Sequence, residues 1–306
     1  MSVKEAPEHP KKFPLGGYLF LIGTAFFTAI SYAFGRAVDR NLDPESTIFF
    51  WFGGALIFSF ITVALLPEQR EEVRNIGKYW KIFLYTSVLT SIGAALWIIS
   101  IRMIGIPLTS FLMKAQTLFA LLLGMIFLGE RLNRGETVGI IITITGGIIV
   151  AYQSDITLLI GTFTALGAAF FYSFISFVVK KVGQRLNMLM VANMRALGVT
   201  LSLLIYLFAT GTFEAPSRPI EYIYMILGGT SGALIAKACQ FQAIKLIDVS
   251  RTTAVLPLES LFVILLSYYI FGEIPSLIKL IGGAGIIIGV IFLVLFRGKE
   301  PDVLDK

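Results

Sequence analysis

Four ionisable side chains interrupt long apolar segments of the sequence and could carry its chemistry. They are Lys114, Arg195, Lys237 and Glu259, each the single charge within its apolar run. A charge in hydrocarbon costs about 2.5–3.5 kcal/mol on insertion scales, so such groups usually face a cavity and a partner. Three cations and one carboxylate favour a substrate with a carboxylate or phosphate group, while Glu259 can accept an amino group or a proton.

The depth of each charge follows from the helical rise of about 1.5 Å per residue. Counted from the ends of their runs, Lys237 and Glu259 lie about 12 Å from the cytoplasmic side, and Arg195 about 14 Å. Lys114 lies roughly 16 Å from the opposite side, close to the midplane. We therefore expect Glu259 to pair with Lys237 when the pocket is empty, and Lys114 to anchor the acidic group of the substrate.

The elements that must position these charges are membrane-spanning helices. The chain has 306 residues, of which 56% are hydrophobic and 14% charged, whereas soluble domains carry roughly 25% charged residues. This composition excludes an ordinary soluble enzyme and a disordered chain, and a single cysteine, Cys239, excludes a disulfide scaffold. Ten runs approach the length of about 20 residues that a bilayer requires. They are 13–35, 46–67, 82–101, 103–129, 137–154, 156–179, 186–213, 222–244, 252–272 and 280–296.

The distribution of Lys and Arg predicts the orientation. Of the 25 such residues, 17 fall on the side that holds both termini and 5 on the other, and cytoplasmic loops carry the excess of positive charge. We expect a multi-pass protein of the cytoplasmic membrane with both termini in the cytoplasm and the first helix retained. The basic charge then reflects cytoplasmic loops and not nucleic-acid binding. The predicted divisions are tails at 1–12 and 297–306 and five-helix halves at 13–152 and 156–296.

An internal repeat relates the two halves. Each half holds five predicted spans, and an odd number forces the second half to cross the membrane upside down relative to the first. Inverted repeats are the usual architecture of alternating-access carriers, with the substrate at the repeat interface near the midplane. The offset in residue number is 144 near the start and 143 later: Gly17 and Gly23 recur as Gly161 and Gly167, Gly129-Glu130 as Gly272-Glu273, and Gly139 and Gly146 as Gly282 and Gly289.

Short motifs near the end of each half resemble a known family. Phe-Leu-Gly-Glu-Arg at 127–131 and Phe-Gly-Glu-Ile at 271–274, each followed by a glycine-spaced last span, are similar to the EamA branch of the drug/metabolite transporter superfamily. Pro257, ahead of the second Gly-Glu, is similar as well. The resemblance implies an all-α integral membrane transporter of ten helices. Lys114 stands where the repeat would place a proline, which suggests a site adapted in this chain.

The repeat also indicates secondary candidates for the pocket. Gln116 is the equivalent of Glu259, and Trp97 is the equivalent of Gln240. Because helix positions i and i+2 point about 200° apart, Lys114 and Gln116 are not both expected at the centre. Asn193 and Tyr32 are further candidates.

Structural roles remain open for several of these residues. Arg195 could bridge helices or extend its long stem to the interface, Lys237 could serve only as the partner of Glu259, and polar amides also hold membrane helices together. Glu130 and Glu273 lie at span ends, where a carboxylate can bond the first amides of the next helix.

These observations predict a secondary transporter that exports or exchanges a small anionic or zwitterionic metabolite, such as an amino acid. A nucleotide, purine or organic-phosphate transporter and a lipid carrier or flippase stay as alternatives. An enzyme is disfavoured because the sole histidine, His9, lies in the polar tail and only one carboxylate is buried. No cofactor or metal is expected. The expected partners are the substrate, membrane lipid and protons coupled through Glu259, with monomer and homodimer both open.

Overall fold

All regular elements in the described residues are helices. The computed structural model describes residues 15–38, 42–128, 133–151, 156–182, 187–246 and 258–296. The predicted tails, Glu130 and Pro257 lie outside these ranges. The elements are α1 (Leu15–Ala37), α2 (Pro44–Leu65), α3 (Pro67–Asn75), the 3-10 helix η1 (Ile76–Tyr79), α4 (Trp80–Met113), α5 (Ala115–Leu128), α6 (Arg134–Ala151), α7 (Ile156–Val182), α8 (Met188–Thr210), α9 (Pro219–Gly229), the π-helix η3 (Thr230–Ala236), α10 (Lys237–Leu246), α12 (Leu258–Phe271) and α13 (Leu277–Leu295).

The outer surface of the bundle is apolar. Ile126, Phe163 and Ile205 are each at least 70% exposed, on a protein whose charged residues are few. Six helices in the described ranges are long and apolar enough to cross a bilayer: α1, α2, α4, α7, α8 and the continuous α9–η3–α10. α12 and α13 are shorter apolar helices. The expectation of an all-α membrane protein is therefore confirmed.

The chain reverses direction within α4. Gly105 has φ +78°, a backbone conformation outside the helical region. The Ser100 and Thr109 hydroxyl oxygens lie 2.8 Å apart, although nine residues of straight helix would separate them by about 13.5 Å along the axis. The predicted runs 82–101 and 103–129 are thus two segments joined by a tight turn. The Thr109 hydroxyl also donates to the Gly105 carbonyl at 2.7 Å, satisfying backbone that the turn frees.

Helix boundaries recur at the offset of the sequence repeat. α5 and α12 are related by this offset at both their first and their last residues. The same relation holds for the starts of α6 and α13 and for those of α2 and α8. The sequence repeat is therefore also a repeat of secondary structure.

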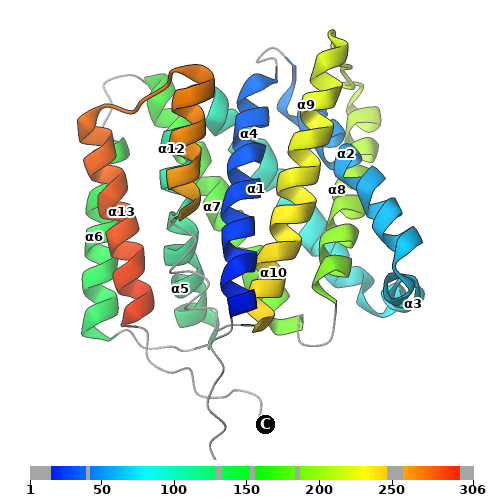
Figure 1. Cartoon of the computed structure of the whole chain (residues 1–306), viewed down its shortest axis with the longest axis horizontal. Helices are drawn as coiled ribbons and strands as arrows, with labels where there is room; N and C mark the ends of the chain where they lie inside the picture. Colours follow the sequence, from blue (N-terminus) through cyan, green and yellow to red (C-terminus); the bar gives the residue numbers. More distant parts are fainter. Residues whose placement is uncertain are drawn as a thin grey trace, which may run out of the picture.

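Repeated glycines pack α6 against α13, which lie side by side in Figure 1. A Cβ atom added at Gly146 would lie 2.6 Å from the Gly282 carbonyl oxygen, and one added at Gly289 would lie 2.7 Å from the Gly139 carbonyl oxygen. Small residues let membrane helices approach this closely. Gly146, late in α6, meets Gly282, early in α13, whereas Gly139 meets Gly289. The two helices therefore run antiparallel.

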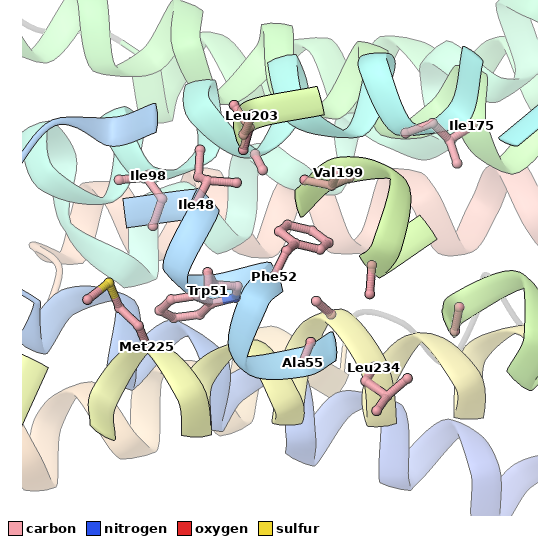
Figure 2. Close-up of a cluster of buried hydrophobic side chains, with 14 of the residues drawn as sticks. Ile48, Trp51, Phe52, Ala55, Ile98, Ile175, Val199, Leu203, Met225 and Leu234 are labelled. Atoms are coloured by element: carbon pink, nitrogen blue, oxygen red, sulfur yellow. The ribbon is translucent and has the colours of Figure 1, made fainter. Parts of the chain in front are cut away.

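The largest buried apolar cluster lies around α2. Figure 2 shows Trp51 and Phe52 of α2 between Val199 of α8 on one side and Met225 and Leu234 of α9 and η3 on the other. Glycines allow α9 to pack closely against α2, since a Cβ atom added at Gly228 would lie 2.3 Å from the Trp51 ring. This packing fixes the Trp51 and Phe52 side chains.

An ion pair joins the end of α1 to the segment before α13. The Arg36 guanidinium contacts the Glu273 carboxylate at 2.5 Å, with both side chains partly exposed. Glu273 therefore has the structural role expected of it, through an ion pair with Arg36 from a distant part of the chain. Figure 1 shows that α1 begins and α13 ends at the same end of the bundle.

Candidate functional site: a charged pocket inside the bundle

One pocket inside the bundle collects the four intramembrane charges. Lys114, Arg195, Lys237 and Glu259 all line it. Three of the four side chains are buried and Lys237 is partly buried. The charges therefore face the interior and not the surrounding lipid. The walls come from α1, α2, α4, α5, α7, α8, η3, α10 and α12.

The ion pair in this pocket joins Lys114 to Glu259. The Lys114 Nζ atom lies 3.0 Å from Glu259 Oε2, and the two side chains are 7% and 10% exposed. The expected pairing of Glu259 with Lys237 is wrong. The sequence placed Glu259 and Lys237 at similar depths in the membrane, and the pairing was expected on that basis. However, α12, which carries Glu259, packs on α1 and α4, and the segment of α4 that ends at Lys114 is its neighbour. The Ser260 hydroxyl reinforces this contact by donating to the Ser110 carbonyl at 3.5 Å.

A helix interruption brings Lys114 and Gln116 to the same pocket. Lys114 separates α4 from α5 and takes part in i to i+3 backbone bonds, to Phe111 and from Thr117. Both Lys114 and Gln116 line the pocket, and the helix is interrupted at Lys114 between α4 and α5. The Gln116 amide donates to the Ser176 hydroxyl at 3.0 Å.

Lys237 interacts with neutral groups. Its ammonium donates to Gln240 Oε1 at 2.8 Å and lies 5.5 Å from the centroid of the Tyr172 ring. Lys237 begins α10 directly after the π-helix η3, and π-helical turns occur often at functional sites.

Arg195 is the most deeply buried cation in the pocket. It is 3% exposed, and its NH2 group donates to the Ala233 carbonyl of η3 at 2.8 Å. The guanidinium lies 5.7 Å from the centroid of the Phe52 ring, and its Nε–H has no hydrogen-bond partner among the described residues. Arg195 thus bridges α8 to η3, as one alternative expected, and still keeps an unused donor.

Aromatic side chains form one wall of the pocket. Tyr32 and Trp97 contact edge to face with centroids 5.1 Å apart, and Trp97 contacts Trp51 in the same way at 5.8 Å. All three line the pocket, as does Gln240. Beyond Tyr32 on α1, Gly35 packs against Trp97, Ile101 and Trp51.

Asn193 lies outside the pocket lining. Its amide donates to the Thr62 hydroxyl at 3.1 Å and to Gln69 Oε1 at 3.4 Å. These bonds hold α8 to α2 and to the short helix α3. The expectation that Asn193 lines the pocket is wrong, because Asn193 lies on the face of α8 that packs against α2 and α3.

Twelve of the lining residues form pairs separated by the repeat offset. Six such pairs line the pocket, each with one member from either half. Sequence reasoning missed Tyr172, Ser176 and Trp51, although the offset from Tyr32 and Arg195 could have found Ser176 and Trp51. The pairs are Thr28 and Tyr172, Tyr32 and Ser176, Trp51 and Arg195, Ala94 and Lys237, Trp97 and Gln240, and Gln116 and Glu259.

This pocket combines charged, polar and aromatic side chains. In the ranges that the structure describes, no group of three or more His, Cys, Asp or Glu side chains converges. A charged, partly aromatic pocket inside an apolar helical bundle is a feature of membrane transport proteins.

The chain belongs to the EamA-like transporter family, whose profile matches residues 15–152 and again residues 159–295. The two matches are related by the same offset as the sequence motifs and the helix boundaries. A protein of Methanothermobacter thermautotrophicus described as an uncharacterized transporter is 24% identical over 93% of this chain and 88% of its own length. A solved protein structure with 14% identity superimposes with a TM-score of 0.62 over 94% of this chain and 98% of its own, which supports the fold. The protein is therefore a membrane transporter.

Proposed function

We propose that the chain is a secondary transporter that exports or exchanges a small anionic or zwitterionic metabolite, such as an amino acid, by alternating access. The observation that carries the proposal is the convergence of four charged side chains on one pocket inside a bundle with an apolar outer surface. Charges at this depth are costly in a bilayer, and a pathway for a charged solute is a function that uses them.

The proposed architecture is ten crossings in two inverted halves, 13–152 and 156–296. The double match to the family profile and the recurring helix boundaries support it. So do the neighbours of α1 and α7: α1 packs on α10 and α12, and α7 packs on their counterparts α4 and α5. The antiparallel contact of α6 with α13 is also the contact expected for equivalent helices in halves of opposite orientation.

The two halves could exchange conformations around the pocket. Arg36 binds Glu273 at one end of the bundle, and we propose that this ion pair closes the pocket on the side that faces the outside. Both termini would then lie in the cytoplasm, with the chain in the cytoplasmic membrane. Opening requires separation of Arg36 from Glu273, while substrate or a proton at Glu259 would weaken its pair with Lys114 and shift the balance between states.

The proposed partners are membrane lipid, a second copy of the chain and the substrate. Membrane lipid covers the apolar exterior, and both a monomer and a homodimer are compatible with the proposal. A nucleotide, purine or organic phosphate is the second candidate substrate class. The excess of cations over carboxylates among the described lining residues favours a phosphate within that class, since Lys and Arg both bind phosphate.

Exchange across vesicle membranes tests the transport function. Purified protein in liposomes loaded with one unlabelled amino acid or organic phosphate should accumulate the labelled form of that compound faster than protein-free liposomes do. Trp97→Ala should lower this exchange about tenfold or more, because it removes a large contact from the pocket wall. Trp80→Ala is the matched control, since the Trp80 ring is on the surface and 56% exposed. Flux that does not respond to the loaded compound would contradict a carrier.

A further inference from the structure

The two halves of the pocket differ in chemistry at equivalent positions. Where the first half supplies Trp51, Ala94 and Trp97, the second half supplies Arg195, Lys237 and Gln240. At these positions the first half is therefore aromatic or apolar, and the second half supplies a cationic wall that consists of Arg195 and Lys237. A solute bound in the pocket would direct its anionic groups toward these two residues of α8 and α10.

The charges of the pocket do not balance. Lys114 and Glu259 neutralise each other across 3.0 Å. Arg195 binds a carbonyl and a ring, and Lys237 binds an amide oxygen and a ring. Among the described lining residues no second carboxylate is present. Two positive charges in a partly desolvated pocket repel each other and are stabilised by a ligand that carries their counter-charge.

We infer that the substrate is a dianion, a dicarboxylate or a phosphate monoester, held by Arg195 and Lys237. This inference rests on the proposed transport function and narrows its substrate. The Nε–H of Arg195 has no hydrogen-bond partner among the described residues, and the planar guanidinium matches the geometry of a carboxylate or phosphate. Lys237 supplies a second point charge. A zwitterion fits less well, because its ammonium group requires a carboxylate and Glu259 is already bound to Lys114.

A matched four-carbon series tests the charge. The melting temperature of the full-length purified protein is measured with succinate, butyrate or 4-aminobutyrate, and with glycerol 3-phosphate against glycerol. Ligand binding raises the melting temperature with concentration and affinity. We expect at least one dianion to raise it more than all the other compounds do. Succinate and glycerol 3-phosphate distinguish the dicarboxylate from the phosphate source.

Substitutions in the cationic wall test the location. Arg195→Gln and Lys237→Gln should each weaken dianion binding roughly ten- to hundredfold, the loss expected for a hydrogen bond to a charged group. Arg195→Lys keeps the charge and tests the site if Arg195→Gln fails to fold. Arg218→Gln, which removes a cation that is 59% exposed and absent from the pocket lining, should bind as the wild type does.

Several results would overturn the inference. They are a larger shift with 4-aminobutyrate than with either dianion, no shift with either dianion, and unchanged dianion binding in both the Arg195 and Lys237 variants. Failure of the transport proposal is a separate outcome: the dianion would bind to the pocket, but the protein would not exchange it across the vesicle membrane.

Discussion

Glu259→Gln is expected to destabilise the protein by about 3–5 kcal/mol, because it leaves the buried Lys114 ammonium without its counter-charge. The pair is 3.0 Å apart and almost fully shielded from solvent. It also joins α12 to the helix interruption at Lys114, so its loss affects two elements of the pocket. The measurement is the melting temperature of the purified variant, together with its rate of exchange in liposomes.

Two double variants separate charge balance from transport. Lys114→Met with Glu259→Leu removes both charges, and such apolar replacement of a buried pair is often neutral or stabilising. We expect this variant to fold and to lose exchange. Lys114→Glu with Glu259→Lys restores the pair in reverse and should regain stability over Glu259→Gln. A Glu259→Gln protein with wild-type stability and exchange would contradict both roles of the pair.

Gly146→Ala is expected to disrupt the contact between α6 and α13. The new Cβ atom would lie 2.6 Å from the Gly282 carbonyl oxygen and 2.6 Å from the Ile286 amide nitrogen. Both are backbone atoms, so the helices must separate. Overpacking typically costs about 1–3 kcal/mol. Here it would also separate α6 from α13, a contact between the two halves.

Gly147→Ala is the matched control on the same helix, because nothing lies within 4 Å of its added Cβ atom. Its melting temperature should be equal to or above that of the wild type, since Ala favours a helix over Gly. Gly289→Ala should destabilise the protein about as much as Gly146→Ala, as the pseudo-equivalent position. Equal stability of the Gly146 and Gly147 variants would contradict the close glycine packing.

Much of the fold could be predicted because helices that contact lipid require long apolar segments, which are easily recognised in the sequence. Apolar runs predicted the helices, and the offset between the repeated motifs recurs in the bounds of α5 and α12. The turn at Gly105 was predicted only as a boundary between runs. Its position near Pro107 is a local signal, whereas the polar contact of Ser100 with Thr109 arises only after the chain reverses.

The sequence predicted which charged residues line the pocket better than it predicted which of them are in contact. A charge in a membrane helix must avoid lipid, so Lys114, Arg195 and Glu259 could be placed inside from sequence alone. Which of them touch depends on the neighbours of each helix, and helix depth carries no such information. The Lys114 interruption was missed because lysine has no backbone preference that marks a helix break, and Asn193 was misplaced because a buried amide serves packing as well as binding.

Access to the pocket from both sides of the membrane is the most direct test of the central claim. In a Cys239→Ser background, Thr28→Cys places one thiol in the pocket, and Ile126→Cys places a control thiol on the exposed apolar surface. A membrane-impermeant maleimide is added to right-side-out or inside-out vesicles. Alternating access predicts that the Thr28→Cys thiol reacts from either side and the Ile126→Cys thiol from neither. Reaction of the Thr28→Cys thiol from one side only, with and without succinate, glycerol 3-phosphate or amino acids, would contradict the carrier.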